Sequence, residues 1–259
     1  IGSNLVDELV RLKHKVIVID NLVTGQIKNL KKNSKKIKFF KIDISKKKNI
    51  TKLNNIFKNI DCVYHLAGLA DIIPSIENPY KYYEVNVTGT LHALQAAKLN
   101  KIKKFIYAAS ASCYGKSPNF PTDEKCKVFT EYPYALTKSL GEKLVLHWNK
   151  VYSLNTSSFR FFNVYGPRAT TTGAYGAVFG IFLSQKINKK PLTIVGNGKQ
   201  TRDFIHVSDL VNALVLAIKR SKPGEIYNIG SSKETSVNEI AKLIGGKKIY
   251  VPKRPGEPL

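Results

Sequence analysis

The sequence predicts an α/β fold in which a doubly wound parallel sheet is followed by a smaller α/β domain. Short runs of apolar residues, such as those at 16–20 and 105–109, are typical of parallel strands that are buried on both faces. Segments with apolar residues at helical spacing lie between these runs, beginning with Leu5, Leu9 and Leu12. In open α/β sheets the carboxyl ends of the strands form the ligand crevice. We therefore expect helices on both faces of the sheet and a functional site at this edge.

Length and composition indicate a globular protein. The 259 residues are enough for one large core or two unequal ones, and 43% of them are hydrophobic. No apolar run approaches the ~20 residues that would span a membrane, and we find no secretory signal. The three cysteines, Cys62, Cys113 and Cys126, lack a Cys-x-x-Cys spacing. We expect reduced thiols in a cytoplasmic protein, with no disulfide, no metal site and no membrane partner.

A formal charge of +24 raises the question of nucleic-acid binding. Much of the excess charge lies between Lys28 and Lys52. This region contains no interleaved pattern of stacking aromatic residues and no familiar nucleic-acid-binding motif. A solvated, lysine-rich face is therefore favoured and no nucleic-acid partner is expected, although a positive field also attracts anionic ligands.

The first half of the chain alternates strands and helices. In a dinucleotide-binding unit, the opening helix would follow a first strand and a glycine loop. That strand and the earlier glycines are missing, so we expect this chain to be a fragment. After the opening helix we expect strand 16–20, strand 37–43, helix 51–59, strand 62–67, helix 79–100, strand 105–109, helix 132–152 and strand 156–162.

The regular alternation weakens beyond residue 163. We therefore expect a first domain at 1–163 and a smaller domain at 164–259, interleaved with the first. Ser236 and Glu239 form a capping box at the start of the last helix. The elements expected here are a glycine-rich segment and a helix within 164–190, strand 191–195, a turn at 196–198, helix 209–220, strand 225–229 and helix 236–244.

Tyr134 and Lys138 are four residues apart on an expected helix and therefore share one face. A free tyrosine titrates near ~10, but a neighbouring ammonium group favours the phenolate and lowers the pKa. A tyrosine whose pKa is near the working pH can take a proton from a substrate hydroxyl. Ser110, which follows a buried strand, is expected beside this pair, and residues 116–131 are expected as a loop over it. Alone, the pair also fits a solvated helix face.

A series of short motifs in a fixed order supports the interpretation that Tyr134 and Lys138 belong to a reactive site. They are Asp20-Asn21, His65-Leu-Ala-Gly68, Asn86, Ser110 to Gly115, Tyr134 to Lys138, Asn163 to Arg168 and Thr201-Arg-Asp-Phe204. In these motifs nearly the whole chain resembles the extended short-chain dehydrogenase/reductase family, and within it the nucleotide-sugar epimerases. The resemblance implies a Rossmann-type doubly wound parallel sheet, without its first strand here, and a smaller substrate-binding domain.

The resemblance also implies NAD as the cofactor. Asp20 would accept hydrogen bonds from the adenosine ribose and repel a 2′-phosphate, which favours NAD over NADP. Gly2 would be the last glycine of the phosphate loop, at the N-terminus of the opening helix. His65 is expected to have a structural partner rather than a role in proton transfer. The other cofactor-binding residues implied are Asn21, Asp43, Ile44, Leu66, Ala67, Gly68, Asn86, Tyr134, Lys138 and Phe161.

The implied reaction is 4-epimerisation of a UDP-hexose. Tyr134 would take the proton of a sugar hydroxyl while the carbon beneath it passes hydride to NAD. Lys138 would hold the cofactor ribose, and Ser110 would hydrogen-bond the reacting oxygen. The 4-keto sugar would then regain hydride on its other face. The substrate-binding residues implied are Ser110, Asn163, Thr193, Val195, Arg202 and Arg254.

Other functions stay open at this point. Nucleotide-sugar 4,6-dehydratases and UDP-glucuronate decarboxylases resemble the chain but carry an acid in the serine loop, where this sequence has Ala111 and Ser112. A non-catalytic basic RNA-binding protein would not need the complete set of Ser110, Tyr134 and Lys138. The residue that selects the sugar in the family would follow Leu259, so both plain and N-acetylated hexoses remain candidates.

The helix expected at 132–152 has a second apolar stripe, roughly 200° from Tyr134 at about 100° per residue. Two apolar faces on one helix predict packing against its own sheet and against another body. The resemblance implies that this body is a sister subunit, with helices 79–100 and 132–152 pairing into a four-helix bundle. The stripe consists of Leu136, Leu140, Leu144 and Trp148.

Overall fold

The computed structural model describes residues 1–116, 120–169 and 178–252. Its larger part contains a parallel sheet with β4 in an interior position. In spatial order the strands are β3 (Cys62–His65), β4 (Lys104–Ser110), β5 (Thr156–Phe161) and β9 (Ile226–Ile229). A second parallel pair consists of β1 (Val16–Asp20) and β2 (Ile37–Lys41). The α/β class and the parallel sheet predicted from the sequence are confirmed.

The strand pairs of this larger part form two sets. Within the described ranges, β1 and β3 are not hydrogen-bonded to each other. The two sets nevertheless share a core, because Val16 of β1 packs in the same cluster as Cys62 and Tyr64 of β3. Helix α1 (Gly2–Arg11) contributes Leu5 and Leu9 to that cluster. Side-chain packing therefore joins the two sets where backbone pairing does not.

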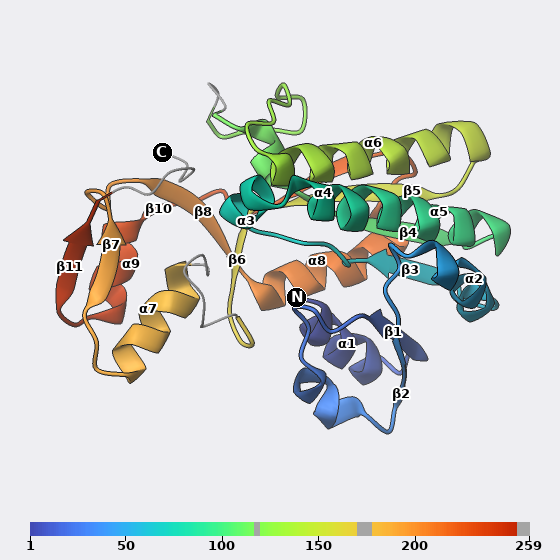
Figure 1. Ribbon diagram of the computed structural model, residues 1–259, viewed down its shortest axis with the longest axis horizontal. Helices are drawn as coiled ribbons and strands as arrows, with labels where there is room; N and C mark the ends of the chain where they lie inside the picture. Colours follow the sequence, from blue (N-terminus) through green and yellow to red (C-terminus); the bar gives the residue numbers. More distant parts are fainter. Residues whose placement is uncertain (117–119, 170–177, 253–259) are drawn as a thin grey trace.

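Helices cover both faces of the sheet (Figure 1). One face packs against α2 (Ile50–Phe57), α5 (Gly89–Leu99) and α6 (Pro133–Tyr152), and the other against α1 and α8 (Val207–Arg220). Along β4, Phe105, Tyr107 and Ala109 belong to the first core, whereas Ile106 and Ala108 belong to the second. This alternation follows from the period of two in a strand. It explains why residues 105–109 of the strand form a continuous apolar run.

The helix expected at 79–100 contains an irregular turn. It begins as α4 (Pro79–Tyr82), continues as a π-helical segment, η3 (Tyr83–Thr88), and ends as α5. Asn86 lies in the π-helical segment and is almost completely buried. Such segments are rare and are often found at functional sites.

The smaller part of the molecule has its own core (Figure 1). Its parallel strands are β7 (Leu192–Val195) and β11 (Lys248–Val251), and its helices are α7 (Val178–Ile187) and α9 (Val237–Ile244). Phe182, Ile194 and Ile240 form the centre of this core. The capping box of Ser236 and Glu239 at the start of α9 is confirmed.

A three-stranded sheet contains the first residues after the expected domain boundary. Its order is β10 (Glu234–Ser236), β8 (Thr201–His206) and β6 (Asn163–Tyr165). Helix α8 and strand β9 follow β8 in the chain but lie in the larger part rather than in the smaller one. The reason is that β9 pairs with β5, while Leu210 and Leu214 of α8 pack with α1. The boundary at 163/164 stays a prediction.

Several short elements were not predicted. They have few residues or a mixed polar sequence, so neither helical nor strand periodicity can be recognised in them. They are η1 (Ile27–Asn33), η2 (Lys47–Asn49), α3 (Ile72–Glu77), η4 (Ala111–Tyr114), β6, β8, β10 and β11.

The second apolar stripe of α6 is divided in the structure. Trp148 is buried, and Leu144 packs against the same core. Leu136 is exposed. The C-terminal end of the stripe therefore belongs to the protein's own interior, because α6 packs there against both α5 and the sheet. Only the N-terminal end faces outward.

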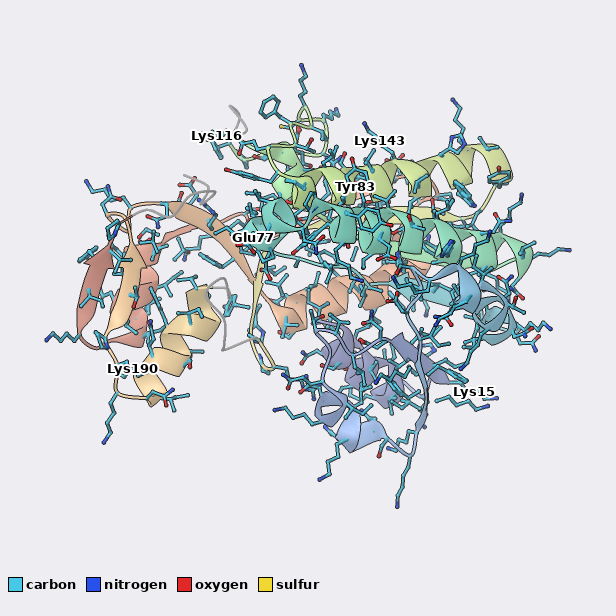
Figure 2. All side chains as sticks on the ribbon, in the orientation of Figure 1. Lys15, Glu77, Tyr83, Lys116, Lys143 and Lys190 are labelled. Carbon is cyan, nitrogen blue, oxygen red and sulfur yellow. The ribbon has the colours of Figure 1, made fainter. Side chains whose placement is uncertain are left out.

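The surface carries many lysine side chains, and Figure 2 shows Lys15, Lys143 and Lys190 extending away from the ribbon. The three cysteines are free thiols. Within the ranges that the structure describes, no helix combines the length and the apolar character needed to cross a membrane.

Candidate active site

The carboxyl end of β4 and the start of α6 carry the three predicted catalytic residues. Ser110 is the last residue of β4, and Tyr134 and Lys138 lie in the first two turns of α6, which packs on β4. Pro133 begins the helix, a position where its missing N–H costs nothing. The backbone N–H of Tyr134 donates to Ser75 Oγ at 3.0 Å, which ties the helix start to α3.

The hydroxyls of Ser110 and Ser112 lie close enough to the Tyr134 hydroxyl to lower its pKa through hydrogen bonding. Ser112 also donates to Ser110 Oγ, from its own Oγ at 2.8 Å and from its backbone N–H at 3.2 Å. The structure thus brings Ser110 and Tyr134 together as predicted and adds Ser112, which sequence reasoning had considered only as the position of a missing acid. Three hydroxyls in mutual contact can hold and pass a proton.

The pKa of Tyr134 differs from the expectation. Burial of the phenol raises this pKa, and the hydrogen bonds from Ser110 and Ser112 offset the rise only in part. The expected lowering by Lys138 is not among the largest contributions. In the protein alone, desolvation of the phenolate is therefore the dominant effect.

Lys138 is only 8% exposed, and its Nζ donates to the backbone carbonyl of Ala108 at 2.6 Å. Burial lowers the pKa of Lys138 to about 8. The ammonium group also lies 5.2 Å from the centre of the Tyr107 ring. The fold thus holds this side chain beside β4, where its charge is poorly solvated and available to a ligand.

Asn86 fixes the backbone that follows β3. Its Oδ1 accepts from the Leu69 N–H at 2.7 Å, and its Nδ2 donates to the Leu69 carbonyl at 3.0 Å and to Thr137 Oγ1 at 3.0 Å. A Cβ on Gly68 would lie 3.1 Å from Asn86 Oδ1 and 3.3 Å from Lys138 Nζ. A side chain at this position would therefore press on Asn86 and Lys138, and glycine permits the close packing. Asn86 holds the loop between β3 and α3 against α6.

Asp20 and Asp43 lie at the carboxyl ends of β1 and β2. Asp20 Oδ1 accepts from the Leu22 N–H at 2.6 Å. Asp43 Oδ1 accepts from the N–H and the hydroxyl of Ser45, at 3.0 and 2.6 Å. Burial works against the charge of Asp43, but these bonds and one from Asn21 hold its pKa below the ordinary value. Both carboxylates are therefore available as hydrogen-bond acceptors at this edge.

The other predicted cofactor residues lie around the same edge. Gly2 is the first residue of α1, and a Cβ added to it would lie 3.8 Å from Leu66. Ala67 is exposed just after β3. Ile44 packs against the start of α5, and Phe161 is buried at the end of β5.

His65 has the structural partner that was predicted. Its Nε2 lies 2.8 Å from Thr90 Oγ1, and Thr90 in turn donates to the Asn86 carbonyl. Because the hydroxyl proton of Thr90 is used there, His65 Nε2–H is the donor to Thr90. Burial and the charge of Lys138 lower the pKa of His65 to about 3. The imidazole is therefore neutral and structural.

The predicted substrate residues lie on β6 and β7. Asn163 Nδ2 donates to the Asp203 carbonyl at 3.0 Å. The backbone N–H of Thr193 donates to Gln185 Oε1 at 3.1 Å, and Gln200 Nε2 donates to the Val195 carbonyl at 3.1 Å. Two glutamine side chains thus contact backbone groups of the predicted substrate residues on β7. Sequence reasoning missed both glutamines, which no spacing connects to β7.

Of the two predicted arginines, one lies within the described residues. Arg202 lies on β8 with a half-buried side chain, and its Nη1 donates to the Thr201 carbonyl at 2.7 Å. Arg254 lies outside the described residues.

A buried ion pair behind the site was also missed. Arg160 of β5 and Glu142 of α6 are 3% and 4% exposed and lie 2.5 Å apart. Arg160 Nη1 donates to the Tyr114 hydroxyl at 2.7 Å. The sequence contained one signal for this pair. Arg160 lies in a strand whose other residues are apolar or small, and a charge in such a strand requires a buried partner.

Comparison with known proteins agrees with this architecture. A profile described as the NAD dependent epimerase/dehydratase family matches residues 1–230. A putative UDP-glucose 4-epimerase of Methanocaldococcus jannaschii is 36% identical, over 99% of this chain and 84% of its own length. A UDP-N-acetyl-α-D-glucosaminuronate decarboxylase of Bacillus cytotoxicus is 35% identical, over 97% of this chain and 80% of its own length.

Among solved structures, that of the UDP-glucose 4-epimerase of Thermotoga maritima with UDP-glucose is similar, with a TM-score of 0.92 and 30% identity. The match covers 98% of this chain and 83% of the other. The order of motifs, the Ser110–Tyr134–Lys138 arrangement and these matches agree on one assignment. The chain belongs to the NAD-dependent epimerase/dehydratase family of enzymes, and NAD is its cofactor.

Proposed function

We propose that this enzyme interconverts the C4 epimers of a UDP-hexose through a transient 4-keto sugar. The observation that carries the proposal is the contact of the Tyr134 hydroxyl with Ser110 and Ser112, in a serine turn that contains no acid. A dehydratase needs a group there that can donate a proton to departing water, and Ala111 and Ser112 cannot supply it. The similarity to UDP-glucose 4-epimerases supports the UDP-sugar.

The residues of this chain fit NAD. The carboxylate of Asp20 ends β1, where it can accept hydrogen bonds from the adenosine ribose, and the N-terminus of α1 begins at Gly2. Gly68 keeps the backbone after β3 free of a side chain beside Lys138 Nζ. Lys138 would hold the nicotinamide ribose with its ammonium group. When bound, NAD supplies the hydride chemistry at C4 of the sugar.

Tyr134 moves the proton. As a phenolate it accepts the proton of the C4 hydroxyl, and it returns that proton to the oxygen when the keto group is reduced. Ser110 and Ser112 donate hydrogen bonds to the reacting oxygens. Because burial raises the pKa of Tyr134, formation of the phenolate depends on positive charge brought close to it. Lys138, with its poorly solvated ammonium group, contributes part of that charge.

A sugar 4,6-dehydratase or decarboxylase is the second candidate. The chain is 35% identical to a decarboxylase and 36% identical to a putative epimerase. These nearly equal identities support the second candidate. Ser112 is the residue that would have to replace the missing acid. The two candidates differ in product, so one experiment separates them.

The test offers UDP-glucose, UDP-N-acetylglucosamine and UDP-glucuronate separately to the protein with NAD. We expect one of them to give its 4-epimer, resolved by NMR, with no net NADH. Released carbon dioxide or a 4-keto-6-deoxy sugar would assign the second candidate. Turnover of only a GDP- or dTDP-sugar would refute the UDP assignment.

The enzyme is also proposed to be a homodimer that pairs α4, α5 and α6 with the same helices of a second copy. Tyr83 of η3, Leu91 of α5 and Leu136 of α6 are large apolar residues that are exposed, and Figure 2 labels Tyr83. Leu136→Glu is expected to convert dimer to monomer in analytical ultracentrifugation. The exposed Leu216→Glu on α8 is the control that should stay dimeric.

A further inference from the structure

Arg160 and Glu142 form a charged centre deep in the protein. Arg160 Nη2 and Nε donate to the two carboxylate oxygens of Glu142 at 2.5 and 3.0 Å, and Ser158 Oγ donates to Glu142 Oε2 at 2.8 Å. Although burial disfavours the charged form, the hydrogen bonds to Glu142 hold the pKa of Arg160 above its ordinary value. This bidentate geometry fixes the plane of the guanidinium group.

The guanidinium group has one further nitrogen, Nη1, and it is directed at Tyr114. Nη1 donates to the Tyr114 hydroxyl at 2.7 Å, and Arg160 Cζ lies 4.7 Å from the centre of the Tyr114 ring. The Tyr114 hydroxyl donates its own proton to Asn228 Oδ1 at 2.8 Å. The hydroxyl is thus held from two sides, by β5 and by β9.

Tyr114 ends the serine turn. It belongs to η4, the same 3₁₀ turn that contains Ser112 and directly follows Ser110. Gly115 then takes a φ of 55°, and a Cβ on it would lie 2.3 Å from the Phe129 carbonyl. The turn is therefore held at both ends, by the serine hydroxyls at Tyr134 and by the Tyr114 hydroxyl at the ion pair.

Stability alone does not require this arrangement. A buried ion pair can often be replaced by apolar residues of similar volume without loss of stability. What apolar residues cannot reproduce is the directed hydrogen bond to a tyrosine hydroxyl in the serine turn. The elements that the ion pair joins, α6 and β5, also carry Tyr134 and lead into Asn163.

We propose that Tyr114, held by Arg160 and Asn228, is a positioning residue that keeps the Ser110 and Ser112 hydroxyls aligned with Tyr134. Glu142 fixes Arg160 for this purpose. The proposal rests on the proposed function, because the alignment serves proton transfer at Tyr134. None of these residues other than the serines and Tyr134 needs to touch the substrate.

The test is a mutant cycle with Tyr114→Phe, which removes the hydroxyl and keeps the ring. We expect kcat for sugar epimerisation to fall about tenfold with KM within about twofold, because a small misplacement of a catalytic group lowers the rate of a bound complex. In the Ser110→Ala background the same change should lower kcat by less than about twofold. Equal factors in both backgrounds, or no fall in kcat, would overturn the proposal.

The matched control is Tyr64→Phe. The Tyr64 hydroxyl donates to the Leu214 carbonyl at 3.0 Å, so this variant also loses one hydroxyl hydrogen bond, on the far face of the sheet. It should lower the melting temperature by a similar amount and leave kcat unchanged. A fall in kcat equal to that of Tyr114→Phe would assign both effects to general stability and refute positioning.

Amide hydrogen exchange supplies a readout that needs no substrate. The N–H groups of Ser112 and Gly115 donate to Ser110 Oγ and to the Ser112 carbonyl, so their exchange reports the order of the turn. We expect faster exchange in the 110–116 segment for Tyr114→Phe and not for Tyr64→Phe. Unchanged exchange would overturn the proposal, whereas a wild-type protein that epimerises no sugar would refute the proposed function and leave this readout intact.

Discussion

Two groups of predicted site residues differ in burial. Lys138 and Asn86 are buried, and their polar atoms are hydrogen-bonded to the backbone around β3 and β4. By contrast, Asn163, Thr193 and Arg202 lie on short strands and are partly or fully exposed. The first group belongs to the core of the larger part. The second group depends on strands of three to six residues and on the smaller part of the molecule. Under the proposed function, the chemistry belongs to the first, buried group, which we call the rigid side of the site. Substrate recognition belongs to the second, more exposed group, which we call the adjustable side. Variants on the two sides are expected to differ in kcat and in KM respectively.

The largest effect is expected on the rigid side, from Tyr134→Phe. Loss of the acid–base group should lower kcat by at least ~10² and leave UDP-sugar affinity within a few-fold. The control is Tyr227→Phe, whose hydroxyl accepts from the Lys222 N–H away from the site. Steady-state kinetics and calorimetric binding separate the two quantities. Unchanged turnover would remove Tyr134 from the mechanism.

Lys138→Met tests the rigid side through pH. In the folded protein the pKa of Lys138 is about 8, below its unfolded value of 10.5. Between these values the unfolded chain binds more protons, so wild-type stability without NAD should rise with pH across this window by up to a few kcal/mol relative to Lys138→Met. Below pH 8 the full cost of burying the charge is present in the wild type. Urea unfolding at several pH values measures the difference, and parallel curves for the two proteins would contradict it.

The same variant should also weaken NAD binding. Lys104→Met is the matched control, because Lys104 is also a buried lysine. It belongs to β4, and its Nζ donates to the backbone carbonyl of Ser221 at 2.5 Å. It lies at the opposite end of the strand from Ser110. If Lys104→Met weakened NAD as much as Lys138→Met, the effect would be one of stability and not of contact.

Asp20→Asn should have an intermediate effect. The change removes the charge at the end of β1, so NAD affinity should fall by about tenfold and discrimination against NADP should weaken. Asp61→Asn, an exposed carboxylate before β3 that pairs with Lys103, is the control. Fluorescence titration with both cofactors measures the change. Retention of full NAD affinity would remove Asp20 from the cofactor site.

The smallest effect is expected on the adjustable side, from Arg202→Lys. A lysine keeps the charge but not the planar fork that binds two phosphate oxygens, so KM for the UDP-sugar should rise a few-fold with kcat nearly unchanged. The control is Arg220→Lys at the exposed end of α8. A fall in kcat without a change in KM would place Arg202 on the rigid side and contradict the division of the site into two sides.

The sequence predicted the rigid side better than the adjustable one, for a physical reason. Strands of a parallel sheet are rich in apolar residues, so β1 was predicted with its observed bounds. A Tyr-x-x-x-Lys spacing can be recognised because a helix fixes it. The proximity of Ser110 to Tyr134 was implied by the family resemblance. The outcome was different for Gln185 and Gln200, which reach the backbone of β7 from positions that no periodicity connects to it.

The pairing of the buried charges could not be predicted from sequence patterns either. Arg160 and Glu142 lie on different elements, and only the three-dimensional packing of α6 on β5 shows that they meet. The pKa of Tyr134 was expected to fall because Lys138 was considered without the desolvation of the phenol. Desolvation depends on burial, which the sequence around Tyr134 does not specify.

The pairing of β9 with β5 also sets the order in which the protein can be made. β5 ends at Phe161, but its neighbour β9 begins at Ile226, after α7, β7, β8 and α8. At roughly 5–20 residues per second, a ribosome needs on the order of several seconds to make the chain between them. During that time β5 is an open edge with unpaired backbone groups, which is a surface prone to wrong pairing. The nascent chain therefore cannot close its main sheet until α7 and β7 of the smaller part have been made.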